Sequence, residues 1–174
     1  MIEEVLIIKE QGCYYGINTE EVEQILRVQE LTPMAMTPEA IRGLCSIEGS
    51  IFCTLDFSYL LDKKSGFVDD AGFKARQITI EAATHHFSLL VSEVINSIEV
   101  DQSKVEYVND ADDAIIGLLK YKDEIIQIVS ISSLIKDIAI PSYTTKDVRD
   151  ISVENSVDGK QSHLQRYLFF TMAK

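Results

Sequence analysis

Hydrophobic and polar positions alternate over short distances along most of this chain, a pattern typical of β-strands rather than of long helices. Two apolar runs, Gly43–Ile47 and Ile51–Phe57, flank the turn Glu48-Gly49-Ser50 and lead into the apolar tail Tyr59-Leu60-Leu61. Glycine supplies the positive φ of a tight turn, so this stretch predicts a β-hairpin. Neither run has a clean polar side, so we expect both faces to be covered, as in a barrel or a sandwich.

The same pattern returns 74 positions later in the chain. Gly43–Leu61 aligns without a gap with Gly117–Ile135, and the first turn falls on Lys122-Asp123-Glu124. Two copies of one hairpin with an apolar tail predict a fold made of two similar halves.

Further strands are expected on either side of this hairpin. Val5–Lys9 and Tyr14–Ile17 flank a turn that contains glycine. Arg76–Ala82 alternates between polar and apolar residues, which predicts a half-exposed strand pairing with Phe87–Val91. Strands that recur about every ten residues indicate an all-β fold with a few short helices.

Helical signals are brief. Thr19 is a candidate capping residue for a short helix whose apolar positions are Val22, Ile25 and Leu26. Pro38–Ile41 fits a single helical turn with proline first. Ser92–Ile98 fits a strand or a helix, because its spacing favours a helix and its β-branched residues favour a strand.

The domain organisation follows from a change in composition near residue 140. Residues 1–140 carry the strand pattern, 141–163 are polar and predict a linker or surface tail, and 164–174 are strongly apolar. An unpaired apolar strand promotes aggregation. The last segment therefore either completes this domain or begins a following one.

The formal net charge of −12 repels phosphate backbones and anionic membrane surfaces, so nucleic acid and lipid are poor partners. No apolar run reaches the roughly 20 residues of a spanning helix. The start Met1–Glu4 lacks the basic region of a signal peptide. The three cysteines, Cys13, Cys45 and Cys53, lie among apolar residues, as reduced thiols of a cytoplasmic protein do.

Catalytic and cofactor motifs are missing from the sequence. It has no glycine-rich phosphate loop and no nucleophile elbow. His85 and His86 are adjacent, and adjacent residues of a strand point to opposite faces, so they do not form a metal site together. Asp110–Asp113 lacks the glycine and the final glutamate of a calcium loop. We therefore expect no enzyme activity, no cofactor and no metal.

A resemblance to a known family rests on spaced motifs. These are Tyr15-Gly16-Ile17, Val22-Glu23-Gln24-Ile25, Thr37–Gly43, Ile47–Ile51, Leu55-Asp56-Phe57, Leu89–Val94 and Ile116–Leu134. Over roughly residues 4–140 the chain resembles the CheW-like domain of bacterial chemotaxis. The resemblance implies two small five-stranded β-barrels packed on a shared apolar seam.

The role that the resemblance implies is a cytoplasmic adaptor recruited to receptor arrays. Such an adaptor couples the cytoplasmic tip of a chemoreceptor to the regulatory domain of a CheA-type histidine kinase. One barrel pairs with the kinase domain, and a groove between the barrels receives the receptor. The candidate partner-binding residues are Val22, Gln24, Gly43, Glu48, Gly49 and Leu90.

The chain departs from the family pattern at several positions. Where the family has Asn-Leu-Arg-Gly, this chain has Ser46-Ile47-Glu48-Gly49, so Glu48 reverses the charge of an arginine. Cys53 replaces a proline of the family pattern, and Ser92 and Ser130 replace aspartates. A reversed charge can abolish a partner or select another one. Besides a divergent adaptor, two alternatives stay open: an N-terminal CheW-like domain of a larger signalling protein, and a small β-barrel enzyme or ligand-binding domain with an unrecognised site.

Overall fold

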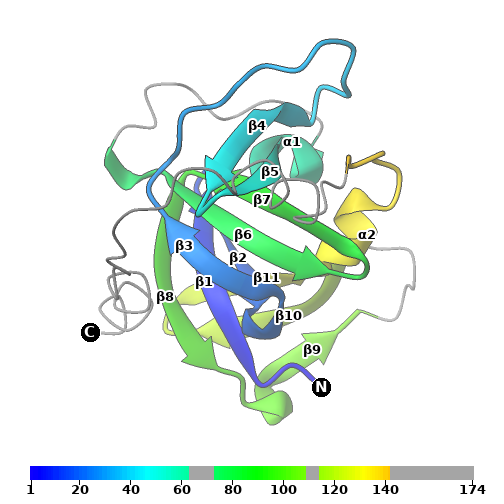
Figure 1. Cartoon of the computed structure of the whole chain (residues 1–174). Coiled ribbons are helices and arrows are strands. Elements are labelled where there is room, and N and C mark those ends of the chain that lie inside the picture. The colour runs from blue at the N-terminus through cyan, green and yellow to red at the C-terminus, as the bar shows by residue number, and fades with distance from the viewer. Residues whose placement is uncertain (63–72, 109–113, 142–174) are drawn as a thin grey trace.

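A computed structural model describes residues 1–62, 73–108 and 114–141 of the chain (Figure 1). Strands dominate this part of the chain, as the short alternating runs predict. In chain order the strands are β1 (Glu4–Glu10), β2 (Cys13–Asn18), β3 (Val22–Leu26), β4 (Ile41–Ile47), β5 (Ser50–Asp56), β6 (Arg76–Ala82), β7 (His85–Val91), β8 (Glu93–Glu99), β9 (Val105–Tyr107), β10 (Ile115–Tyr121) and β11 (Glu124–Val129). Two short α-helices, α1 (Phe57–Asp62) and α2 (Ile131–Ile135), follow β5 and β11. The 3-10 turns η1 (Thr19–Glu21) and η3 (Gln102–Lys104) precede β3 and β9.

The strands form two sheets. Six strands pair in the order β8-β1-β2-β11-β10-β9, and five pair in the order β3-β6-β7-β5-β4. The expected all-β fold in two halves is confirmed. The six-stranded sheet differs from the expected five strands because the three-residue strand β9 adds to the edge of β10. In the other sheet the corresponding pairing is a single bridge, between Thr32 and Leu44.

The internal repeat reaches much further than the hairpin that reveals it in the sequence. The hairpins β4–β5 and β10–β11 begin 74 positions apart, at Ile41 and Ile115, and each leads into a helix. The hairpins β1–β2 and β6–β7 are also equivalent, 72 positions apart, although their sequences share little. Equivalent turns even share a residue at positive φ, Gln11 with Ala83 and Glu48 with Lys122.

Each sheet combines strands from both copies of the repeat, which span Glu4–Asp62 and Arg76–Ile135. β3 follows β2 in the chain but pairs with β6, in antiparallel register with Ile25 opposite Ile78. β8 follows β7 but pairs with β1, with Val5 opposite Ile98. Each sheet is therefore a two-stranded hairpin of one copy paired with the later strands of the other copy, and neither copy holds all of its own hydrogen-bond partners.

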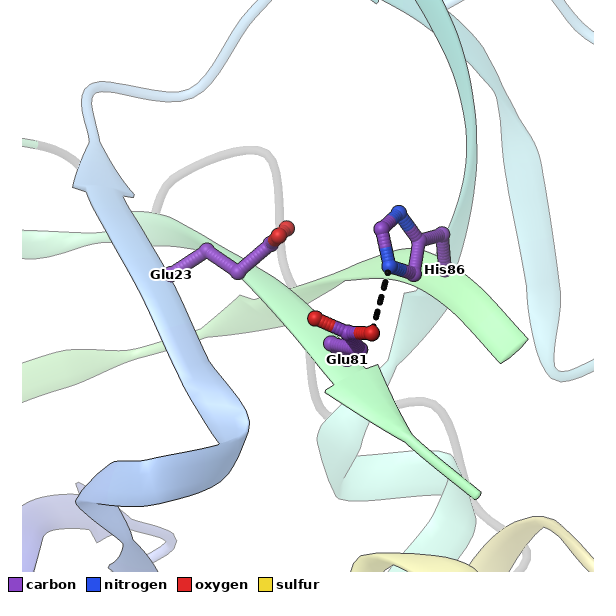
Figure 2. A group of neighbouring side chains, drawn as sticks. All are labelled: Glu23, Glu81 and His86. Carbon is purple, nitrogen blue, oxygen red and sulfur yellow. Dashed lines mark ion pairs between the residues drawn. The ribbon is translucent and has the colours of Figure 1, made fainter. Parts of the chain in front are cut away.

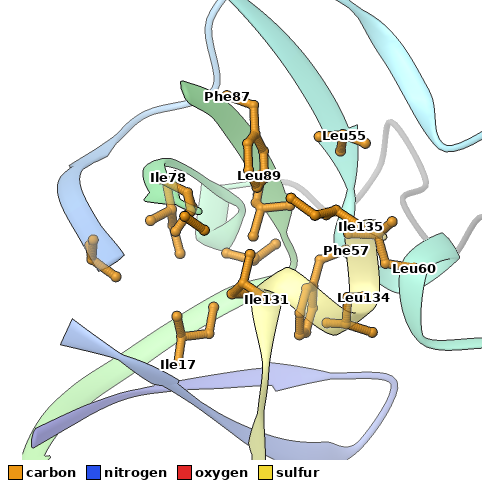
Figure 3. Packing of buried hydrophobic residues seen from close by; sticks show 14 of the residues in the cluster. Ile17, Leu55, Phe57, Leu60, Ile78, Phe87, Leu89, Ile131, Leu134 and Ile135 are labelled. Atoms are coloured by element: carbon orange, nitrogen blue, oxygen red, sulfur yellow. The ribbon is translucent and has the colours of Figure 1, made fainter. Parts of the chain in front are cut away.

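The main hydrophobic core lies between the two sheets (Figure 3). The helices α1 and α2 meet there, and the equivalent residues Phe57 and Ile131 are both fully buried. The rings of Tyr15 and Phe57 pack edge to face, with ring centroids 5.7 Å apart. Burial of apolar surface is the dominant favourable term in folding, so this shared core holds the halves together.

The interiors of the two sheets differ in chemistry. The six-stranded sheet encloses a second apolar cluster, formed by Val5, Ile7, Leu119, Ile126 and Ile128. In the five-stranded sheet the positions equivalent to Val5, Ile7, Leu119 and Ile128 are Gln77, Thr79, Cys45 and Thr54, and all four are buried. The predicted half-exposed strand Arg76–Ala82 is therefore a strand, but its polar residues Gln77 and Thr79 face a polar interior instead of solvent.

The predicted helix over Val22, Ile25 and Leu26 is wrong, because these residues form β3. A β-bulge causes the helix-like spacing: Val22 lies opposite Ile80 and Gln24 opposite Thr79, which leaves Glu23 as an extra residue. The bulge breaks the period of two, so buried positions fall at a helical interval. The capping side chain before the 3-10 turn is Asn18, whose Oδ1 accepts from the Glu20 N–H at 3.2 Å, and not Thr19.

The segment Ser92–Ile98, which fitted either structure in the sequence, is a strand over Glu93–Glu99. Its pairing with β1 shifts between Ile7, opposite Asn96, and Ile8, opposite Val94. This bulge is the equivalent of the one in β3, which explains why both strands have ambiguous sequence patterns.

Candidate functional site

Two of the candidate contact residues form the tight turn between β4 and β5. Ile47 lies opposite Ser50, so the loop consists of Glu48 and Gly49, with φ values of 51° and 83°. Positive φ at both central residues defines the turn type whose twist matches a two-residue hairpin. The turn projects Glu48 into solvent.

Gln24 lies beside this turn. Its Nε2 donates to Oε2 of Glu48 at 3.1 Å. Gln24 belongs to β3 and Glu48 follows β4, the two strands at opposite ends of the five-stranded order. The sheet therefore curls until its end strands meet, and Leu26 of β3 packs with Cys45 and Ile47 of β4 behind the contact. We call Gln24, Glu48 and Gly49 the turn surface.

The other three candidate residues lie inside the protein. Val22 and Leu90 are 8% and 1% exposed, and both are parts of strands. Gly43 lies in β4 with a φ of 146°, where its backbone passes close to that of Thr32. The structure thus brings Gln24, Glu48 and Gly49 together at the surface, and it separates Val22, Gly43 and Leu90 from solvent.

The two serines that replace family aspartates have structural partners. Ser130 caps α2, because its side chain accepts from the Ser133 N–H at 3.2 Å. At the equivalent position before α1, Asp56 accepts from the Tyr59 N–H at 3.3 Å. Serine is therefore an adequate replacement at this cap, since both side chains supply the oxygen that the helix end needs.

Ser92 binds a buried carboxylate. Its backbone N–H donates to Oε2 of Glu10 at 2.9 Å and its hydroxyl donates to Oε1. Glu10 is only 2% exposed and lies at the end of β1. A turn position predicts an exposed glutamate, so the sequence pattern did not reveal this contact across 82 positions. It joins β1 to the β7–β8 junction.

The polar interior of the five-stranded sheet is built on Gln77. Its Nε2 lies 2.8 Å from Ser88 Oγ, 3.2 Å from Thr54 Oγ1 and 3.0 Å from Cys45 Sγ. Its Oε1 accepts from the backbone N–H of Gln29 at 2.9 Å. Buried polar groups need such partners, because an unpaired one is costly. The network fastens the segment after β3 to the sheet that presents the turn surface.

Burial also changes the chemistry of one thiol. Desolvation, and then the neighbouring Cys45, raise the pKa of Cys53 from its ordinary value of 9.0 to about 11. Cys13, in contrast, is exposed. All three cysteines are free in the structure, and burial, which was expected for all of them, holds only for Cys45 and Cys53.

Exposed apolar side chains occur at equivalent positions of both sheets. Ile51 of β5 and Ile125 of β11 lie 74 positions apart, and they are 40% and 62% exposed. Beside Ile125 the surface holds a hollow of about 420 Å³, lined by residues that include Tyr14, Leu118 and Gln127. The lining also includes residues of the β1–β2 and β10–β11 turns, Gly12, Cys13, Asp123 and Glu124.

Three possible metal ligands come together on the five-stranded sheet. Glu23, Glu81 and His86 each place one ligand atom within 4.8 Å of the others (Figure 2). His85 takes no part, as the alternation of a strand predicts. The sequence pattern did not reveal this cluster, because its members come from three strands.

None of the helices that the structure describes is long and apolar enough to cross a membrane.

The fold and its surface define a class of protein, an all-β module in which two copies of one repeat together build two sheets and present tight turns to solvent. A family model described as CheW-like domain matches residues 4–139. The chain belongs to the CheW-like domain family. The crystal structure of the scaffolding protein TtCheW from Thermoanaerobacter tengcongensis is similar, with a TM-score of 0.68 and 21% sequence identity, over 81% of this chain and 100% of that chain. Comparison with curated proteins gives no match.

Proposed function

We propose that this protein is a non-enzymatic adaptor of bacterial chemotaxis, which couples chemoreceptors to a CheA-type histidine kinase through protein–protein contacts. The match of the CheW-like family model over residues 4–139 carries this proposal. The similar solved structure is that of a scaffolding protein, which agrees with a role in assembly. Such an adaptor works in the cytoplasm, at arrays of membrane receptors.

The turn surface is the proposed contact for one partner. Its residues lie on a two-residue turn that is fixed by the bond between Gln24 and Glu48 and by the packing of Leu26 behind it. A contact that is held in place before binding loses less entropy on association. The charge of Glu48 selects a partner that presents a cation at this point.

Val22, Gly43 and Leu90 act indirectly in this proposal. Each is buried, so each supports the strands that carry the contact instead of touching the partner. Gly43 has the clearest supporting role, because it allows β4 to pass close to the segment around Thr32.

The test is a direct binding measurement with purified proteins from the same cell. One arm uses the regulatory domain of the CheA-type kinase, and the other uses the cytoplasmic tip of a receptor. The proposal expects saturable binding to at least one of them, and a larger kinase response when receptor, kinase and this protein are combined. Absence of binding to both at tens of micromolar, a weak affinity for specific interfaces, would refute the adaptor role.

A further inference from the structure

Three side chains from neighbouring strands converge on one face of the five-stranded sheet. Glu81 of β6 and His86 of β7 lie directly opposite each other in the antiparallel register. His86 Nε2 is 3.3 Å from Glu81 Oε1. Figure 2 shows Glu23 extending from β3 toward this pair, and all three ligand atoms lie within 4.8 Å of one another.

The bulge in β3 accounts for the position of Glu23. It is the extra residue between Val22, opposite Ile80, and Gln24, opposite Thr79. Bulges redirect side chains and are often found beside functional sites. Here the bulge adds a second carboxylate to a pair that the regular register of β6 and β7 already forms.

The six-stranded sheet has different side chains at the equivalent positions. The residues equivalent to Glu23, Glu81 and His86 are Ile95, Lys9 and Tyr14. Lys9 Nζ lies over the Tyr14 ring, 5.3 Å from its centroid. The fold that the two sheets share therefore does not require two carboxylates and an imidazole here, and the cluster belongs to the five-stranded sheet alone.

We propose that Glu23, Glu81 and His86 bind a divalent transition-metal ion of the Zn²⁺ type. One imidazole nitrogen and two carboxylate oxygens are a ligand set that zinc accepts, usually in tetrahedral geometry. Tetrahedral bonds of about 2.1 Å place ligand atoms about 3.4 Å apart, so His86 and Glu81 already have a suitable separation and Glu23 has to move closer by at most about 1.4 Å. The side chains of His86 and Glu81 are 54% and 62% exposed, which leaves them room for that movement.

Electrostatics favours a dication at this position. The carboxylates of Glu23 and Glu81 carry like charges at close range, and like charges repel each other. A bound dication offsets both charges. The imidazole selects against Mg²⁺ and Ca²⁺, which prefer oxygen ligands only. Three protein ligands leave one tetrahedral position open to water or to an outside donor.

The site would also fasten β3 to β6 and β7. Glu23 precedes Gln24, which carries part of the turn surface. Metal binding would therefore hold the strand that positions Gln24, whether or not a partner is bound.

The experiment is a calorimetric titration of the chelator-treated full chain with Zn²⁺. A Cys13→Ser background removes the exposed thiol, which is itself a possible zinc ligand. We expect one equivalent to bind and the melting temperature to rise, because a ligand that binds only the folded state stabilises it. His86→Ala, Glu23→Gln and Glu81→Gln should each weaken binding by at least about tenfold, as loss of a direct ligand does.

His85→Ala is the matched control, because it removes the neighbouring histidine and leaves the cluster intact. It should keep the affinity for zinc. Circular dichroism of each variant checks that the fold is retained. An affinity that is the same in His86→Ala as in the background protein would overturn the proposal. Failure to bind zinc would also overturn it and would leave His86 and Glu81 as an ion pair. Equal affinity for Mg²⁺ would contradict the role of the imidazole.

Discussion

Thr32 lies directly against Gly43: a Cβ atom added to Gly43 would come within 2.5 Å of the Thr32 carbonyl oxygen. The same oxygen accepts from the Leu44 N–H at 2.8 Å, and the Thr32 N–H donates back to the Leu44 carbonyl at 2.7 Å. The segment before β4 is therefore held against the strand at a point where only glycine fits. The equivalent Gly117 is less constrained, because a Cβ atom added there would lie 3.1 Å from the Val105 side chain and 3.6 Å from the Glu106 carbonyl oxygen.

Replacement of Gly43 by alanine should lower the free energy of unfolding by about 2–4 kcal/mol, since strain at positive φ and a backbone clash both contribute. The measurement is urea denaturation of the wild type and the variant. Gly49→Ala is the matched control, because Gly49 also has positive φ but has open space around it, and it should lose only about 1 kcal/mol. Equal losses in the two variants would show that the contact with Thr32 is unimportant.

Gln77→Leu tests the polar interior of the five-stranded sheet. The change removes the amide that lies close to Cys45, Thr54 and Ser88, and it leaves the Gln29 N–H without its acceptor. We expect a loss of about 2–4 kcal/mol in stability, because unpaired buried groups each carry a penalty. The comparison variant is Val5→Gln at the equivalent position of the apolar interior, which should also destabilise. A Gln77→Leu protein as stable as the wild type would contradict this account.

The raised pKa of Cys53 predicts that the folded protein loses stability at alkaline pH. Its pKa is about 11 in the folded protein, above the ordinary value of 9.0. Below pH 9 both states hold the proton, and above it the unfolded chain releases a proton that the folded protein keeps. The contribution of the protonated Cys53 thiol to the free energy of unfolding is therefore complete below pH 9 and is lost as the pH rises toward 11. Cys53→Val should show a shallower decrease than the wild type in denaturation experiments across this range.

Thiol labelling gives an independent check on the same residue. At pH 8, Cys13 should react quickly in the folded protein, while Cys45 and Cys53 should react only after unfolding, because they are buried. Cys13→Ser should remove the fast reaction and leave the alkaline decrease in stability unchanged. Fast reaction of two thiols in the native protein would mean that one of the buried cysteines is accessible.

Glu48→Arg tests the turn surface. If the partner presents a cation there, the change should slow association and weaken binding, and the loss should shrink as salt rises. Glu106→Arg is the matched control, an equal charge reversal at an exposed glutamate of β9 in the other sheet. Unchanged rates at low and high salt would make Glu48 an ordinary surface residue. A gain in affinity would show that the partner prefers the arginine of the family pattern.

The sequence predicts the local features of this fold better than the long-range ones. Glycine and the apolar runs are enough to place the hairpin around Glu48 and its copy around Lys122. Alternation in Arg76–Ala82 predicts a strand, but it cannot tell a polar interior from solvent, so the burial of Gln77 and Thr79 is missed. The contact of Gln24 with Glu48 depends on how the sheet curls, and no local pattern carries that information. The cluster around Glu23 depends on a bulge, which the sequence presents as a helix.

The mixed composition of the two sheets says something about ancestry. A single copy of the repeat would keep only its two hairpins, because the pairings β1–β8, β2–β11, β3–β6 and β5–β7 all join different copies, and it would expose those sheet edges. Two identical copies would satisfy each other, each pairing its first hairpin with the later strands of its twin in an intertwined homodimer. Joining the copies by gene duplication and fusion would give the present chain. The two interiors would then be free to diverge, one toward Val5 and Ile7 and the other toward Gln77 and Thr79, without changing how the strands pair.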